Sequence, residues 1–130
     1  MWNLLLQAIK TGYRLFDGAY DYRNEKEAGE GIKRAISEGL VKREDIFVTT
    51  KLWNNYHRKQ HVIQMAKAQN DAWGLGYIDL YLMHYPIALK YISPDELKYP
   101  VSLMQFSLHY YWYLKDLVDK CGKNAHLWAR

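Results

Sequence analysis

Three apolar runs in this sequence each end on an ionisable side chain, and the runs recur at nearly constant spacing. They are Tyr13–Phe16 before Asp17, Ile46–Thr50 before Lys51, and Ile78–Met83 before His84. Lys51 follows Asp17 by 34 residues, and His84 follows Lys51 by 33. A strand, a loop and a helix together take roughly 30 residues, so each step predicts one βα unit. Because parallel strands end at the same edge of a sheet, we expect the acid, the base and the imidazole to meet there.

Helical periodicity fills the intervals between these runs. Apolar residues from Trp2 to Ile9 predict a first helix that stops before Gly12. A second helix is predicted from Asn24 to Glu38, with Asn24 as its N-cap, and a third from Lys59 to Trp73. Strands separated by helices favour parallel pairing with right-handed crossovers. The sequence therefore predicts an α/β fold with about three parallel strands and flanking helices.

Composition limits the class of protein. The 130 residues suffice for one domain, and the apolar share of 49% with a charged share of 25% is typical of a globular protein. The net charge of +4 comes from dispersed basic residues, which disfavours nucleic-acid binding as a primary role. Cys121 is the single cysteine, so no intramolecular disulfide can form. With no convincing signal peptide or membrane span, we expect a cytoplasmic protein with no membrane partner.

The strand-end residues and a nearby tyrosine form a set suited to carbonyl chemistry. Tyr22 lies five residues after Asp17, in the loop expected at the same edge of the sheet. An ammonium such as that of Lys51 beside a phenol favours release of the phenol proton, and Asp17 can balance the buried ammonium. His84 can orient a carbonyl oxygen. This set suits protonation of a carbonyl while a hydride reaches its carbon, and the hydride would have to come from a nicotinamide.

The same residues carry a resemblance to a known family. The segment 12–19 with Tyr22 and Asn24-Glu25 resembles the signature of the aldo-keto reductases, and the segments 51–54 and 82–86 resemble two further motifs of that family. The run Lys51–His57 is especially similar to fungal D-xylose reductases. The match extends from about Ala8 to Pro100.

The resemblance implies a fold and an activity. It implies a partial (β/α)8 TIM barrel and an NADPH-dependent (or NADH-dependent) reduction of an aldose aldehyde, such as D-xylose to xylitol. It implies catalytic roles for Tyr22 as the acid and for Lys51, Asp17 and His84. It also implies that His84, Trp53 and Tyr85 contact the substrate, a small aldehyde or aldose. It leaves the cofactor-binding residues unknown, because the family binds most of its cofactor with its C-terminal half.

The chain departs from the family in length and in its last thirty residues. Aldo-keto reductases are more than twice as long, so residues 1–130 are interpreted as one partial domain, a truncated N-terminal fragment with a divergent tail over 101–130. Only the segment 112–118 weakly resembles a further helix of the family. We therefore expect the chain by itself to lack reductase activity. The alternative is a non-catalytic fragment that acts by pairing with another protein.

An incomplete barrel predicts exposed apolar surface. Three strands leave two open edges and an uncovered face, which would allow self-association. We expect side chains on all three strands to lack part of their cover; they are Leu15, Val48, Leu80 and Leu82.

Other motifs in the sequence predict no site. Gly29-Glu30-Gly31 lacks the third glycine of a dinucleotide loop and lies inside a predicted helix. His57 and His61 have metal-ligand spacing but no third ligand, so no metal site is predicted and both are expected on a solvated helix start. Ser37 and Ser102 lack the context of a hydrolase nucleophile, and Cys121 lacks an activating neighbour.

Overall fold

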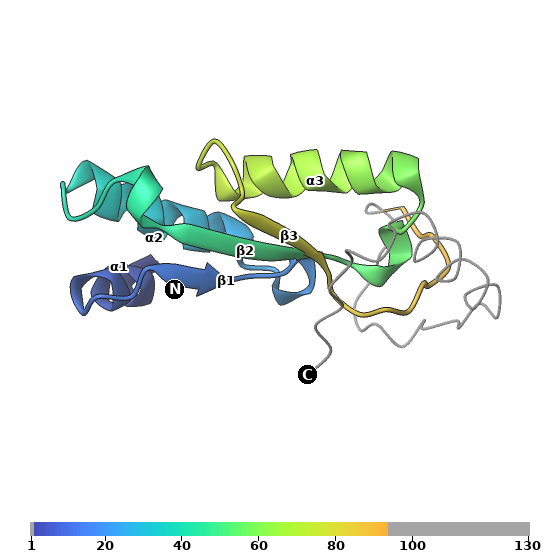
Figure 1. The fold of residues 1–130 in the computed structure, drawn as a ribbon, viewed down its shortest axis with the longest axis horizontal. Coiled ribbons are helices and arrows are strands. Elements are labelled where there is room, and N and C mark those ends of the chain that lie inside the picture. The colour runs from blue at the N-terminus through green and yellow to red at the C-terminus, as the bar shows by residue number, and fades with distance from the viewer. Residues whose placement is uncertain (1, 94–130) are drawn as a thin grey trace, which may run out of the picture.

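The computed structural model describes residues 2–93, in which helices and parallel strands alternate along the chain (Figure 1). The helices are α1 (Trp2–Lys10), α2 (Glu25–Ser37) and α3 (Lys59–Trp73), and the strands are β1 (Leu15–Asp17), β2 (Phe47–Leu52) and β3 (Leu80–Met83). Short 3₁₀ turns η1 (Tyr20–Tyr22), η2 (Arg43–Asp45) and η3 (Asn54–Tyr56) connect them. This order confirms the predicted succession of one helix, two βα units and a third strand.

The bounds of the predicted helices are confirmed to within a few residues, but one cap is not. The α3 helix has the predicted bounds, and it ends at Gly74, whose φ of 61° is the left-handed conformation that terminates helices. Asn24 occupies the N-cap position of α2, yet its side chain makes no capping hydrogen bond, so that part of the prediction is wrong. The first turn of α2 instead carries two acidic residues, which the helix dipole favours.

The three strands form one parallel sheet in the order β1-β2-β3. Asp17 pairs with Thr49, and Lys51 pairs with Leu82. Since side chains alternate along a strand, Phe16, Val48 and Thr50 point to one face, while Asp17 and Lys51 point to the other. Because the strands are parallel, all three bring their carboxyl ends to one edge of the sheet, as the spacing of the apolar runs predicts.

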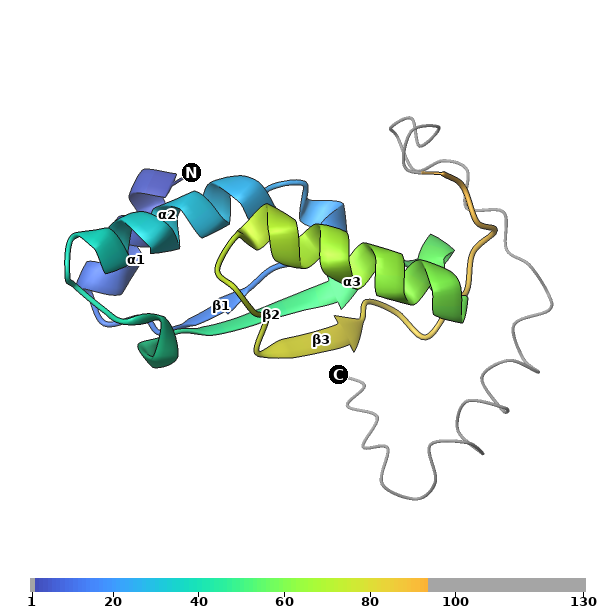
Figure 2. The same ribbon diagram turned by 90° about the horizontal axis from the view of Figure 1, so that it is seen from above.

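Within residues 2–93, the helices pack on one face of the sheet (Figure 2). The main core packs Phe16 and Val48 of the sheet against residues of α1, α2 and α3, including Ile9, Ile32 and Trp73. Val48 is fully buried there, so the prediction that it lacks cover is wrong. Its place in β2 points it at the helices, a fact that the strand pattern alone does not give.

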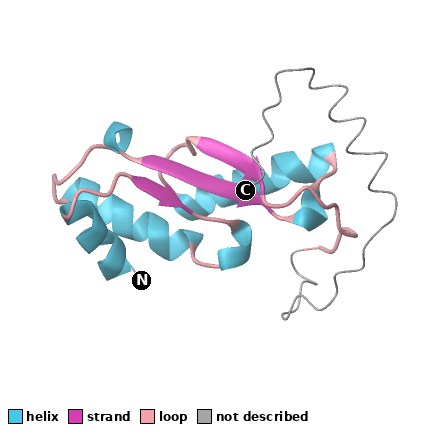
Figure 3. Cartoon of the chain, turned by 60° about the horizontal axis from the view of Figure 1, so that its bottom comes forward, coloured by secondary structure: helices cyan, strands magenta, loops and turns pink. Residues whose placement is uncertain are grey.

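The opposite face of the sheet carries no helix among the described residues, and Figure 3 shows the strands lying over the helices on this side. Leu15 is 60% exposed, and Leu80 and Leu82 are each about 40% exposed, which confirms the prediction for these three. Phe47, which pairs with Leu15, is exposed as well. We call these four residues the open apolar face; it also carries Asp17 and Lys51.

Two helices approach each other unusually closely at a glycine. A Cβ atom added to Gly29 of α2 would lie 1.9 Å from the backbone oxygen of Trp73, the last residue of α3. Gly29 is thus required for helix packing, and the prediction that Gly29-Glu30-Gly31 lies inside a helix is confirmed.

Among residues 2–93, no helix is both long and apolar enough to cross a membrane. The predicted divergent tail over 101–130, the weakly similar segment 112–118, Ser102 and Cys121 lie outside the described residues.

Candidate active site

The four residues predicted for carbonyl chemistry come from four different positions in the fold and meet at one end of the sheet. Asp17 ends β1, Lys51 is the penultimate residue of β2, and His84 directly follows β3. Tyr22 is the last residue of η1, the turn that follows β1. The predicted clustering of these side chains is confirmed, because each contacts another of the set.

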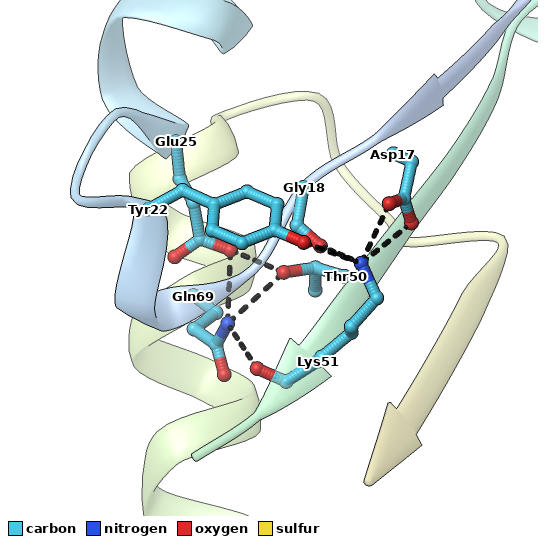
Figure 4. A network of polar contacts seen from close by, with 7 residues as sticks. All are labelled: Asp17, Gly18, Tyr22, Glu25, Thr50, Lys51 and Gln69. Atoms are coloured by element: carbon cyan, nitrogen blue, oxygen red, sulfur yellow. Dashed lines mark hydrogen bonds and ion pairs between the residues drawn. The ribbon is translucent and has the colours of Figure 1, made fainter. Parts of the chain in front are cut away.

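The ammonium of Lys51 lies at the centre of the site (Figure 4). Its Nζ donates to both carboxylate oxygens of Asp17, at 2.8 and 2.6 Å, and to the backbone carbonyl of Gly18 at 3.0 Å. It also donates to the phenol oxygen of Tyr22 at 3.4 Å. The Lys51 side chain is only 15% exposed, so Asp17 supplies the counter-charge that a largely buried ammonium needs.

This arrangement fixes the role of the Tyr22 hydroxyl. An ammonium has hydrogens to donate and no lone pair, so the Tyr22 oxygen must accept from Lys51. The hydrogen of the phenol is then left for a second acceptor. Tyr22 is 45% exposed, so that acceptor can come from outside the protein.

His84 stands beside Tyr22 within a group of aromatic rings. Its ring centroid lies 5.7 Å from that of Tyr22, 5.4 Å from Trp53 and 4.5 Å from Tyr85, and the last contact is stacked. The backbone N–H of His84 donates to the carbonyl of Leu52 at 3.0 Å, which anchors it to the end of β2. The two other predicted substrate contacts, Trp53 and Tyr85, are therefore both placed next to the imidazole.

The environment of His84 favours the neutral imidazole. Burial lowers its pKa first, and the positive charge of Lys51 lowers it further, against a smaller opposing effect of Asp21 and Asp17. Its Nδ1 is buried and has no hydrogen-bond partner among the described residues, so Nε2 is the ring nitrogen that a ligand can meet. A neutral imidazole can donate one hydrogen bond to a carbonyl oxygen without carrying charge into the site.

A buried polar network behind the site was not predicted. The Oε1 atom of Glu25 accepts from the hydroxyl of Thr50, from Gln69 at 2.9 Å and from the indole of Trp73 at 3.0 Å. Gln69 accepts in turn from the Tyr81 hydroxyl at 2.6 Å. The sequence holds one signal for it: Gln69 lies between Met65 and Trp73 at four-residue steps, and a polar residue on a core-facing helix stripe needs a partner.

The two histidines that we expected on a solvated helix start are buried. His57 and His61 are each 8% exposed, and the ring of His61 stacks on Tyr91 with centroids 3.8 Å apart. The prediction of a solvated helix start is wrong because the segment after β3 folds back over η3, where Asn55 donates to the carbonyl of Lys90 at 2.7 Å. No group of three or more potential metal ligands occurs among residues 2–93.

The cluster can protonate a carbonyl oxygen. The phenol of Tyr22 supplies a hydrogen, the neutral imidazole of His84 a second donor, and Lys51 a positive charge next to the phenol. This donor set fits the carbonyl side of a nicotinamide-dependent reduction, in which the cofactor supplies the hydride.

Comparisons with known proteins agree with this chemistry. The sequence profile of the Aldo/keto reductase family matches residues 2–123. The chain is 64% identical over 93 residues to an NAD(P)H-dependent pentose reductase of Pyricularia oryzae, covering 72% of the chain. It is 48% identical over 124 residues, or 88% of the chain, to a probable NAD(P)H-dependent D-xylose reductase of Emericella nidulans.

A solved structure shares the fold as well. The Bombyx mori aldo-keto reductase, crystallised in complex with NADP, superposes with a TM-score of 0.67 at 38% identity, over 92% of this chain and 37% of that one. The chain spans 28% of the length of the pentose reductase and 39% of that of the D-xylose reductase.

Proposed function

The chain belongs to the aldo/keto reductase family, and we propose that its site serves the NADPH-dependent reduction of an aldose aldehyde such as D-xylose to xylitol. The observation that carries the proposal is the bonding of Lys51, which makes the Tyr22 oxygen an acceptor and leaves the phenol hydrogen for a substrate. We further propose that the protein works in the cytoplasm, consistent with its lone cysteine.

The chain's own residues would prepare the aldehyde for reduction. The carbonyl oxygen would accept hydrogen bonds from Tyr22 and from Nε2 of His84, with Trp53 and Tyr85 beside it. NADPH, when bound, supplies the hydride that attacks the carbonyl carbon. As negative charge develops on the oxygen, the Tyr22 proton passes to it, and the ammonium of Lys51 stabilises the resulting phenolate. Asp17 keeps Lys51 in place throughout.

The described residues provide the proton-donating half of this chemistry. Tyr22, Lys51 and Asp17 lie on the exposed side of the sheet, where both an aldehyde and a nicotinamide can approach. We assign none of residues 2–93 to holding the dinucleotide itself. For this reason the whole reaction is proposed for a protein in which this segment is joined to the remainder of such an enzyme.

A chimera tests the proposal directly. This chain's matched segment would replace the 93 aligned residues of the Pyricularia oryzae pentose reductase, and oxidation of NADPH would be followed with D-xylose. We expect turnover in the chimera and its loss in Tyr22→Phe, because that variant lacks only the proton donor. Tyr13→Phe is the matched control, since Tyr13 is exposed and lies outside the site. A folded chimera that is inactive, or one that keeps full activity without the Tyr22 hydroxyl, would refute the proposal.

One observation favours a second candidate, a non-catalytic role through protein pairing. The open apolar face exposes Leu15, Phe47, Leu80 and Leu82 on adjacent strands. A chain that binds a partner through this face would do so without NADPH, and its affinity would be unchanged by Tyr22→Phe. Sedimentation of the 130-residue chain without NADPH measures self-association through this face, with the same result expected for Tyr22→Phe. Turnover of the chimera, which depends on Tyr22, separates the reductase from this second candidate.

A further inference from the structure

A buried carboxyl group connects the same two segments whose side chains form the proton-donating pair. Glu25 is 8% exposed and lies in the first turn of α2, three residues after Tyr22. Its carboxylate accepts a hydrogen bond from the hydroxyl of Thr50, the residue that directly precedes Lys51 on β2. Figure 4 shows the bond between Glu25 and Thr50 behind the contact of Tyr22 with Lys51.

The two contacts lie on opposite faces of β2. Thr50 is fully buried and points toward the helices, whereas Lys51, its neighbour, points to the open face. The segment from Tyr22 to Glu25 is short and turns sharply at Arg23, which has a left-handed φ of 55°. A displacement of Glu25 relative to β2 would therefore be passed on to Tyr22, because only two residues separate them.

The rest of the network keeps Glu25 in one place. The Gln69 amide donates to Glu25 at 2.9 Å, to the Thr50 hydroxyl at 3.1 Å and to the backbone carbonyl of Lys51 at 3.3 Å. If Glu25 lost the Thr50 and Gln69 donors, only the Trp73 indole would remain of the three donors to its Oε1 atom, which is unfavourable for a buried carboxyl group. The network thus opposes a displacement of Glu25 that breaks these bonds.

We propose that Glu25 is a positioning residue: through its bond to Thr50 it holds the Tyr22 oxygen within hydrogen-bond reach of the Lys51 ammonium. The margin is small, since the contact measures 3.4 Å and a hydrogen bond is lost a few tenths of an ångström beyond that. The catalytic meaning of this role rests on the proposed function. The positioning itself does not, and it can be measured without turnover.

The test is a spectroscopic measurement of the pair in the full 130-residue chain. The Lys51 ammonium lies over the Tyr22 ring, 5.0 Å from its centroid, so the ε-methylene of Lys51 should show a ring-current shift and a nuclear Overhauser contact to Tyr22. Thr50→Val removes the hydroxyl and keeps a β-branched side chain in the strand. Both signals should fall by about half or more, since the pair leaves hydrogen-bond reach.

Tyr81→Phe is the matched control. Tyr81 pairs with Thr50 across the sheet and donates its hydroxyl to Gln69, so each variant removes one hydroxyl from the same network. Among the described residues, Thr50 bonds Glu25 directly to the strand of Lys51, whereas Tyr81 reaches Glu25 only through Gln69. We therefore expect Tyr81→Phe to leave both signals in place. Thr50→Ser restores the hydroxyl and should restore the signals. If Thr50→Val does not fold, Thr50→Ala removes the same hydroxyl without placing a new methyl group against Glu25.

The outcomes are separable from those of the activity test. Loss of both signals in Thr50→Val or Thr50→Ala, with retention in Thr50→Ser and Tyr81→Phe, supports the positioning role whether or not the chimera reduces xylose. Signals unchanged in Thr50→Val or Thr50→Ala, equally weakened in Tyr81→Phe, or absent from the unsubstituted chain would overturn it.

Discussion

The close approach of α2 and α3 allows us to predict whether one small substitution stabilises or destabilises the protein. Gly29→Ala adds a methyl group inside a helix, where alanine is favoured over glycine by about 1 kcal/mol. Helix propensity alone therefore predicts a more stable protein. The structure predicts the opposite, because the added Cβ would lie 1.9 Å from the Trp73 backbone oxygen and 2.7 Å from its carbonyl carbon.

The magnitude follows from the shift that the clash requires. The neighbour is backbone and cannot rotate away, so α3 must move about 1.5 Å to reach the 3.4 Å of an ordinary contact. Overpacking of this kind destabilises by about 3 kcal/mol at the upper end of its usual range. After the gain in helix propensity, a net loss of about 2 kcal/mol remains. The same movement would stretch the 3.0 Å bond from the Trp73 indole to Glu25.

Urea denaturation followed by circular dichroism measures the predicted loss. Glu30→Ala is the control, since Glu30 is the exposed neighbour of Gly29 in the same helix and its removal opens no contact with α3. We expect a lower midpoint for Gly29→Ala and little change for Glu30→Ala. A Gly29→Ala protein as stable as the original, or more stable, would show that the helices are not packed as described.

Three further predictions concern an ion pair, a buried histidine and the open apolar face. Asp79→Asn should lower the free energy of unfolding, measured by urea denaturation, by about 3 kcal/mol, because Arg43 is largely buried and loses the carboxylate that lies 2.7 Å away. A loss below about 1 kcal/mol would mean that the ion pair behaves as an exposed one. Burial lowers the pKa of His57 below 6.5, so near that pH His57 binds fewer protons in the folded state than in the unfolded state, and the free energy of unfolding should fall as the pH drops through about 6.5. If the melting temperature of His57→Gln depended on pH as steeply as that of the original chain, this prediction would be wrong. Leu82→Lys should reduce self-association in sedimentation, whereas Leu4→Lys, on an exposed position of α1, should not; equal effects would exclude the open apolar face as the contact.

Much of the site was predictable because its residues mark local boundaries. Asp17, Lys51 and His84 each interrupt an apolar run, and equal spacing of such runs implies equal supersecondary units. Tyr22 was predictable for a similar reason, since the loop after a strand lies at the carboxyl edge of the sheet. The bonds that join Asp17 and Tyr22 to the Lys51 ammonium, and the direction of the bond from Lys51 to Tyr22, came from the structure.

The polar network of Glu25, Thr50 and Gln69 was not predictable from spacing. These residues lie on α2, β2 and α3, and their separations along the chain, 25 and 44 residues from Glu25, follow no regular period. Glu25 alone reads as an acidic residue in a first helical turn, which the helix dipole explains without any partner. Only the packing of both helices on one face of the sheet brings the three together.

The sequence by itself determined the order of the elements, the parallel sheet, and the identity of the ionisable residues at its carboxyl edge, because periodicity and helix termination are local properties of a chain. The tertiary structure decided which side chains are covered. Val48 is buried and Leu80 is exposed, although both are aliphatic strand residues, because the helices occupy one face of the sheet. It also decided that His57 is buried and that Glu25 stands behind Tyr22, since burial and hydrogen bonding depend on neighbours that are distant in sequence.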